Sequence, residues 1–471
     1  MTPRAMAVRL GLAEPGELVV DRLDLEHHGL EIVRPLDTPD AFDEATDVGS
    51  GGLATKRGAL VLSAGTLASG VLAYAFNVLA ARALGPEGYG PIAVLWAAVF
   101  LLAVVLFRPL EQTLSREIAE RSAHGIDSRP VIRSVVRLGI GITIGMTLIC
   151  VALSGPITDG LFDGHASLTL ALGAGVIGYC LSYLVRGVLG GVRWFGGYGT
   201  LLFADGAIRL AVALPLVFVA SIEVAALAIV LAAVGGALAP LLAPKRRLST
   251  HLVRPGSAPF ELGHVLRFAG PVTAVAVSEQ VLVSGGPLLI VLAGGEGAVA
   301  AAGVVFAATM LVRAPVFLFQ GVSAALLPSL TRLDALGHTA RFWRAVLRTL
   351  SVLALFSGLL VAGALAVGPE AMHALYGSGF EVSRTDLTVL TAGIGCYLLA
   401  ATLSQALLAR ARATAAGAIW VSSAVVFVAV ELLVGGSALH RVSVAFAAAS
   451  LLMTVLFVGL ALRDRGSGEP A

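Results

Sequence analysis

The chain alternates long apolar runs with short polar loops from Gly58 almost to its C-terminus. Each run has about 20 mostly apolar residues, the length at which a helix spans the hydrocarbon core of a bilayer. A transmembrane barrel would instead need segments of about 10 residues with alternating polarity. The pattern predicts twelve helical spans, near residues 58–81, 91–114, 131–154, 167–190, 200–220, 224–243, 265–293, 298–328, 342–367, 385–409, 417–435 and 442–462.

The composition agrees with this pattern. Of the 471 residues, 57% are apolar and 13% are charged, and the mean hydropathy is +0.90. An ordinary soluble domain has roughly 25% charged residues. These values exclude a water-soluble globule and predict an all-α polytopic membrane protein.

The longest inner loop, residues 244–264, divides the spans six and six. An even number of spans in each half gives both halves the same orientation, which predicts two parallel six-helix bundles around a central cavity. Such a pair favours an alternating-access transporter over a channel. The predicted domains are a tail (1–55), an N-terminal bundle (56–243), the linker (244–264), a C-terminal bundle (265–462) and a second tail (463–471).

The loop charges predict the orientation, because Lys and Arg accumulate in short cytoplasmic loops. With the N-terminus inside, the outer connections carry only Arg82, Arg384 and Arg441. The inner connections carry most of the other basic residues of this region: Arg108, Arg116, Arg121, Arg129, Arg133, Arg186, Arg193, Lys245, Arg246, Arg247, Arg254, Arg267, Arg332, Arg341, Arg344, Arg348, Arg410, Arg412, Arg463 and Arg465. We therefore expect a protein of the cell membrane with both termini in the cytoplasm.

Residues 1–55 differ in charge from the rest of the chain. They hold 11 acidic and 4 basic side chains and no apolar stretch long enough for a signal-peptide core. We expect this tail to be disordered. Its role is left open between an unstructured leader and a segment that docks a partner.

Several chemistries have no sequence support. A phosphate-binding P-loop needs a Gly-Lys pair, whereas Lys56 follows Thr55 and Lys245 follows Pro244. The cysteines Cys150, Cys180 and Cys396 lack metal-site spacing. We therefore predict that the protein is not an enzyme, has no cofactor or metal, and binds no nucleic acid.

Glu279 and Arg313 are the ionisable residues placed deepest in the predicted spans. A charge at the centre of a span costs at least about 2.5 kcal/mol, so it usually faces a cavity or a partner. Two interpretations remain: a buried structural pair on adjacent helices, or cavity residues that bind substrate or carry a coupling proton.

Four further residues hold charges near or within the spans. Asp205 and Arg209 are four residues apart on one helix, and either neutralise each other or line a cavity. Arg186 and Glu431 lie close enough to a membrane surface for their charged ends to reach water.

Four segments carry a family resemblance. The segment RALGPEGYG (82–90) resembles the opening motif of Wzx-type polysaccharide flippases, in the multidrug/oligosaccharidyl-lipid/polysaccharide exporter superfamily. RGVLGGVRWFGGYG (186–199) resembles the loop between the fourth and fifth helices of that family. APVFLFQGVSAALLPSLTRL (314–333) resembles its eighth helix, and ALYGSGF (374–380) resembles the outer loop after its ninth helix.

The resemblance implies a flippase that moves a polyprenyl-diphosphate-linked oligosaccharide from the inner to the outer leaflet for surface polysaccharide biosynthesis. Arg186, Arg209 and Arg313 are the candidate substrate-binding residues, because a guanidinium binds phosphate in a bidentate manner. Glu279 and Asp205 are the candidate ion-coupling residues. The glycan polymerase and glycosyltransferases of the same pathway are possible partners.

The first of these segments also has a physical interpretation. We expect residues 82–90 to form a turn in which Pro86 ends a helix and Tyr89 lies in the interfacial aromatic belt.

Two alternatives remain. A cation-coupled drug or metabolite antiporter of the same superfamily would need a compact acidic and aromatic pocket. A membrane glycan polymerase or ligase would need an outer catalytic loop, and no loop exceeds about twenty residues.

Overall fold

The computed structural model describes residues 48–242, 262–410 and 412–466. The chain divides into two compact units, Met1–Lys56 and Arg57–Ala471, and the second unit contains all the predicted spans. The predicted tail (1–55) and linker (244–264) lie almost entirely outside the described residues, as does the second half of the C-terminal tail. Those domain boundaries remain predictions.

The first half of the membrane region consists of helices only, within the part of the chain that the structure describes. We call this group of helices the N lobe. Its elements are α3 (Val48–Ala123), α4 (Arg129–Ala152), α5 (Ser154–Phe162), α6 (Ala166–Gly191), α7 (Phe195–Ala213) and α8 (Ile222–Leu238), with the 3-10 turns η2 (Leu214–Val217) and η3 (Ala239–Leu242).

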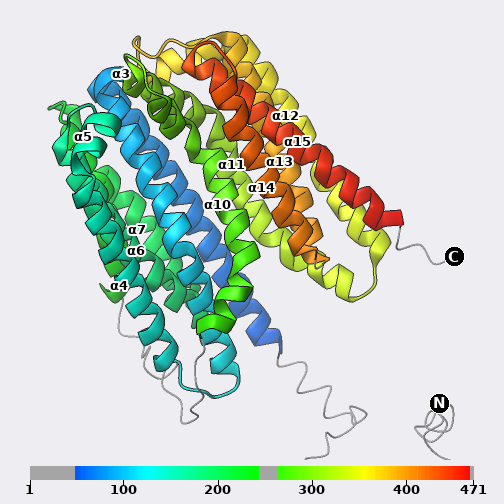
Figure 1. The fold of residues 1–471 in the computed structure, drawn as a ribbon. Coiled ribbons are helices and arrows are strands. Elements are labelled where there is room, and N and C mark those ends of the chain that lie inside the picture. The colour runs from blue at the N-terminus through cyan, green and yellow to red at the C-terminus, as the bar shows by residue number, and fades with distance from the viewer. Residues whose placement is uncertain (1–47, 243–261, 411, 467–471) are drawn as a thin grey trace, which may run out of the picture. The chain divides into compact units, whose positions relative to one another are not determined.

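The second half, the C lobe, is also helical. Its elements are α10 (Leu262–Ala293), α11 (Ala298–Ala335), α12 (Thr339–Tyr376), α13 (Arg384–Ala409), α14 (Ala413–Leu433) and α15 (Ala438–Gly466). Figure 1 shows α3 to α8 in blue through cyan to green and α10 to α15 in green through yellow to red. All twelve predicted spans coincide with helices, because α3 is long enough for two of them. The predicted all-α membrane fold is confirmed.

The chain breaks between two helices within the segment 82–90, where a turn is predicted. The turn is shorter than expected, because the rest of the segment is helical and only Gly85 has non-helical geometry, with φ 67° and ψ 177°. A left-handed φ is accessible to glycine at little cost. Pro86 then starts the second half of α3, where a missing N–H costs little.

Two other segments depart from the expected pattern. The short helix α5 occupies part of the predicted loop between the third and fourth spans. The ninth span, α12, continues beyond its predicted end at residue 367, with non-helical geometry at Val367 (φ −133°, ψ 16°) two residues before Pro369. Proline disrupts the preceding turn without ending the helix, which explains the longer element.

Small residues bring the helices of each lobe into close contact. In the N lobe, a Cβ added at Gly187 of α6 would lie 2.8 Å from Leu114 Cβ on α3. In the C lobe, a Cβ added at Gly393 of α13 would lie 2.8 Å from Phe446 on α15. Such contacts are typical of membrane helices, which associate through close backbone packing. They position the polar side chains that face the other lobe.

Candidate functional site

The two lobes contact each other around the break in α3. Tyr89 is fully buried, donates a hydrogen bond to Asn77 Oδ1 at 2.9 Å, and packs its ring against Phe306 and Phe380 of the C lobe, with centroids 6.3 and 5.9 Å away. Its expected position in an interfacial aromatic belt is therefore wrong. The reason is that Gly85 turns the chain so that Tyr89 faces the C lobe.

Next to Tyr89, the two lobes meet backbone to backbone. A Cβ added at Gly90 would lie 2.3 Å from the carbonyl oxygen of Val299, and one added at Gly303 would lie 2.8 Å from the Cα of Gly90. These distances are too short for any side chain. The crossing of α3 and α11 therefore requires glycine at both positions.

Two of the segments that carry the family resemblance contact each other here. Arg82 donates from Nε to the carbonyl oxygen of Leu375 at 2.7 Å, and from Nη2 to that of Ala374. Pro86 lies against Gly379, where an added Cβ would be 2.8 Å from the proline Cδ. We call this contact between residues 82–90 of α3 and the C-lobe segments 299–306 and 374–380 the Gly85 seal.

Farther along α3, an ion pair connects the lobes. Arg108 Nη1 of the N lobe lies 3.8 Å from Glu279 Oε2 of α10, and the two side chains are 41% and 36% exposed. Tyr397 of α13 donates a hydrogen bond to Glu279 Oε1 at 2.9 Å. Glu279 thus bridges the two lobes and remains partly accessible.

Arg313 lies near Glu279 without pairing with it. Its Nη1 donates to the carbonyl oxygen of Val283 at 3.0 Å, and its buried Nε has no hydrogen-bond partner among the described residues. The expected alternative of a structural pair between Glu279 and Arg313 is therefore absent. Arg313 retains donors for another acceptor.

The N-lobe side of this region holds further polar groups. The Arg186 guanidinium lies over the Tyr183 ring, 4.9 Å from its centroid, and close enough to the Glu111 carboxylate to interact with it electrostatically. The Tyr198 hydroxyl in turn donates to Glu111 Oε1. Arg186 Nε is buried and has no hydrogen-bond partner within the described ranges.

Arg108 connects these N-lobe groups to the C lobe, because it lies 3.8 Å from Glu279 of α10 and close enough to the Glu111 carboxylate to interact with it electrostatically. We call this set of residues the interlobe polar cluster. It consists of Arg108, Glu111, Tyr183, Arg186, Tyr198, Glu279, Arg313 and Tyr397.

Asp205 and Arg209 form a buried pair apart from that cluster. Arg209 Nη2 lies 2.6 Å from Asp205 Oδ2 and donates to the Tyr179 hydroxyl at 2.9 Å. The Arg209 side chain is 2% exposed and its guanidinium lies 4.7 Å from the Trp96 ring centroid. In this conformation Asp205 and Arg209 neutralise each other. Whether they bind substrate or couple ions in another conformation stays a prediction.

Trp96 links the Arg209 site to the other lobe. Its ring centroid lies 6.3 Å from that of Phe306, which also contacts Tyr89 in the Gly85 seal. A movement that opens the seal would therefore remove one side of the packing around Trp96, the ring that covers Arg209.

Glu431 of α14 does not reach water, contrary to expectation. Its side chain is fully buried, and neither carboxylate oxygen has a hydrogen-bond partner among the described residues. Arg441, on α15, donates only to the backbone carbonyl of Glu431, at 3.1 Å. Glu431 is close to the C-terminal end of α14, but the packing of α14 against α15 buries its carboxyl group.

Arg108, Glu111, Tyr198 and Tyr397 are site residues that the sequence did not predict. Arg108 counted only as a positive charge of an inner connection. The sequence does contain an indication of this site. Arg108 and Glu111 are three residues apart near the end of an apolar run, so both charges lie on one helix face and indicate a polar surface there. The tyrosines become visible as site residues only when the helices are packed.

Among the described residues, no group of three or more His, Cys, Asp or Glu side chains could hold a metal ion.

The comparisons with known proteins fit this architecture. Residues 55–334 match the family model described as polysaccharide biosynthesis protein. The chain belongs to this family. It is also 31% identical over 413 residues to an uncharacterized protein of Mycobacterium tuberculosis H37Rv, a match that covers 81% of this chain and 88% of the relative. An uncharacterized protein of Mycobacterium bovis is 30% identical over 404 residues with the same coverage.

Solved structures show the same fold. One is a MATE family multidrug resistance transporter of the MOP superfamily in an inward-facing conformation, with a TM-score of 0.63, 16% identity, and coverage of 87% of this chain and 98% of that chain. An outward-facing structure of the same class gives a TM-score of 0.59 with 16% identity, covering 88% and 96%. This family member is thus a multi-pass membrane protein with the two-lobe fold seen in these transporters.

Proposed function

We propose that this protein exports a lipid-linked oligosaccharide, carried on a polyprenyl diphosphate, across the cell membrane by alternating access. The observation that carries the proposal is the interlobe polar cluster. Arg108, Arg186 and Arg313 come from three helices in two lobes, and Arg186 and Arg313 each keep a buried Nε without a hydrogen-bond partner in the described chain. Guanidinium groups of this kind match the oxygens of a diphosphate.

The two contact regions provide the two gates that alternating access needs. The Gly85 seal holds the lobes together on one side of Trp96, and the partly exposed pair Arg108–Glu279 lies on the other. The loop charges support an outer position for the Gly85 seal. The described conformation then corresponds to one in which the substrate enters from the cytoplasm.

Glu279 supplies a route for coupling export to a cation. While its carboxylate faces Arg108, it competes with a phosphate for the same guanidinium. A proton bound to Glu279 removes that competition, so that Arg108 binds the diphosphate. Loss of that proton restores the pair and weakens the binding of the anion.

A deletion strain complemented with variants tests the function. In the absence of the protein, lipid-linked oligosaccharide should accumulate on the inner leaflet and surface glycan should be lost. Arg313→Ala should fail to restore surface glycan although the protein is inserted at normal abundance. A matched control is Arg341→Ala, which removes an arginine outside the interlobe cluster. Full restoration by Arg313→Ala would contradict the site, and normal surface glycan in the deletion strain would contradict the function.

A cation-coupled drug or metabolite antiporter is the second candidate. It is favoured by the fold of the multidrug transporters and by the acidic and aromatic contact between Glu279 and Tyr397. The same deletion strain separates the two. Increased sensitivity to toxic organic cations with unchanged surface glycan would identify the antiporter.

The remaining expectations follow from the export proposal. The glycan polymerase and glycosyltransferases of the same pathway would be functional partners, because they supply and consume the lipid-linked substrate. Both termini would lie in the cytoplasm. Cysteine labelling at the two faces of intact cells tests this orientation.

A further inference from the structure

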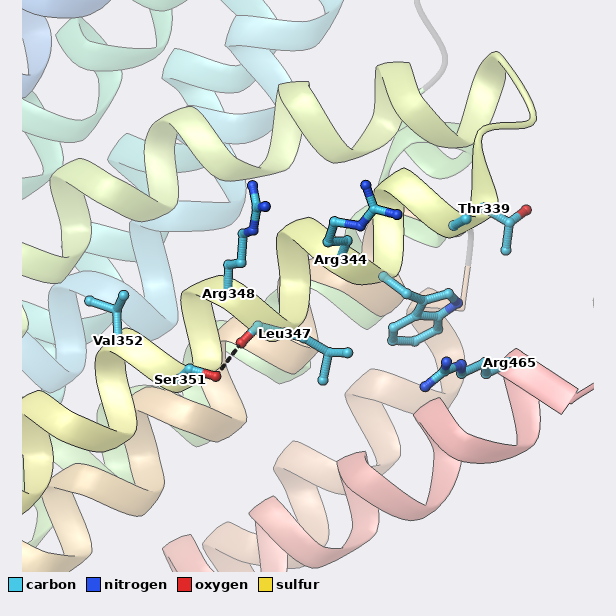
Figure 2. A pocket seen from close by; sticks show the side chains of 9 residues that line it. Thr339, Arg344, Leu347, Arg348, Ser351, Val352 and Arg465 are labelled. Atoms are coloured by element: carbon cyan, nitrogen blue, oxygen red, sulfur yellow. Dashed lines mark hydrogen bonds between the residues drawn. The ribbon is translucent and has the colours of Figure 1, made fainter.

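A basic groove lies on the C lobe, away from the interlobe polar cluster. It has a volume of about 880 Å³ and is lined by the first turns of α12 and the last turn of α15. Figure 2 shows Arg344 and Arg348 pointing the same way from α12, one turn apart, and Arg465 on the other helix. The lining residues are Thr339, Ala340, Trp343, Arg344, Leu347, Arg348, Ser351, Val352 and Arg465.

The charge of this groove is not neutralised within the described chain. No carboxylate lines it, and the ion pairs of the described residues include none of its three arginines. Asp464, which precedes Arg465, instead lies 2.6 Å from Arg410 Nε and 3.1 Å from Arg412 Nη2. The groove therefore presents three cationic groups to an anion from outside the chain.

A neutral donor adds to these charges. Trp343 lines the groove and is 7% exposed, and its indole Nε1 has no hydrogen-bond partner among the residues described. A buried N–H without an acceptor is costly, and an anion in the groove would supply the acceptor. The first turn of α12, which begins at Thr339, adds the positive end of a helix dipole.

The position of the groove along α12 matches the depth of lipid headgroups. The 38 residues of α12 extend about 57 Å at 1.5 Å per residue, beyond the roughly 30 Å hydrocarbon core, so its first turns lie at a membrane surface. Beyond Ser351, the exposed residues of α12 as far as Val367 are apolar, and Val352, Leu355 and Leu359 are 64 to 69% exposed. An anionic group bound to the arginines would therefore lie next to a track of apolar side chains that faces the lipid.

We propose that this groove binds the phosphate of an anionic membrane phospholipid, with its acyl chains along the apolar track of α12. The combination of basic side chains at headgroup depth and an apolar continuation favours a lipid over a free phosphate. The site is independent of the export proposal, because no member of the interlobe polar cluster lines it.

Lipid binding to the purified full-length protein tests the proposal. Detergent-solubilised protein is titrated with phosphatidylglycerol or phosphatidylcholine, and bound lipid is counted by native mass spectrometry. The wild type should bind phosphatidylglycerol preferentially. Arg348→Gln/Arg465→Gln should weaken that binding by at least about tenfold, since each arginine near a membrane surface contributes about 1 kcal/mol to anionic-lipid binding.

A matched control is Arg341→Gln/Arg463→Gln. It removes the same charge from the same two helices at positions that do not line the groove, and should change binding by less than about twofold. Trp343→Phe keeps all charges and removes only the indole donor, so a reduction of about fivefold is expected. Thermal unfolding of each variant shows that the fold is intact.

Three results would overturn the proposal. One is equal binding of the two lipids by the wild type. Another is an equal loss in the control pair, which would indicate a general surface charge effect. The third is displacement of phosphatidylglycerol by glycerol phosphate or inorganic phosphate at comparable concentration, which would identify a free phosphate as the ligand.

Discussion

Arg108 Nη1 and Glu279 Oε2 lie 3.8 Å apart across the two lobes, and both side chains are partly exposed. Tyr397 donates a hydrogen bond to the same carboxylate. The two residues are far apart in the sequence and belong to different helical bundles. A partly exposed pair of this kind stabilises a protein by roughly 0 to 1 kcal/mol. Its weakness suits a contact that would have to break in each cycle of the proposed export.

Glu279→Gln should abolish export while leaving the fold unchanged. The substitution removes the charge that competes for Arg108, so a short-chain polyprenyl diphosphate should bind up to about fivefold more tightly, the equivalent of about 1 kcal/mol. Surface glycan in the complemented deletion strain and binding to purified protein are the two measurements. Wild-type export by this variant would exclude Glu279 from coupling. Glu296→Gln, on the loop before α11, is the control for removal of an acidic charge.

Gly90→Ala should prevent the Gly85 seal from forming. The added methyl would lie 2.3 Å from the Val299 carbonyl oxygen, so the lobes have to separate at this point. We expect loss of export at normal abundance, together with faster labelling of a cysteine introduced at Ala300. Gly145→Ala in α4 is the matched control, because a Cβ there meets nothing within 4 Å. Unchanged export and labelling in Gly90→Ala would show that the seal is not required.

Asp205→Asn should destabilise the protein by about 3 to 5 kcal/mol. It leaves the buried Arg209 charge without its ionic partner, and breaking a buried pair on one side carries a cost of this size. The double variant Asp205→Asn/Arg209→Gln removes both charges and should recover most of the stability. Thermal unfolding measures both.

The same double variant also tests the transport role of the pair. If Asp205 and Arg209 only neutralise each other, a stable double variant exports normally. Loss of export in a stable double variant would show that the pair acts on substrate or ion in another conformation.

Glu431→Met should retain or increase stability. Both carboxylate oxygens are buried without hydrogen-bond partners in the described chain, and exchanging an unpartnered polar group for an apolar one of similar volume is neutral or favourable. Thermal unfolding is the measurement. A loss of more than about 2 kcal/mol would mean that the carboxyl has a stabilising partner.

The sequence by itself determined the class of protein and the positions of its helices. Apolar runs of bilayer length form helices, because the backbone polar groups of such a run can all be hydrogen-bonded within a helix in the hydrocarbon core. It also identified Glu279 and Arg313, since a charge at membrane depth is unusual for any sequence. The segments 82–90 and 374–380 were visible as motifs, but nothing in them showed that they touch.

Only the tertiary structure decided which of these side chains meet. The contacts of Arg108 with Glu279, of Tyr89 with Phe306 and of Arg209 with Trp96 depend on how helices from distant parts of the chain pack and rotate. Helix periodicity places a residue on one face of its own helix and carries no information about the helix opposite. Close glycine crossings such as Gly90 with Gly303 fix that packing, and through it which charges face the space between the lobes and which are buried as a pair.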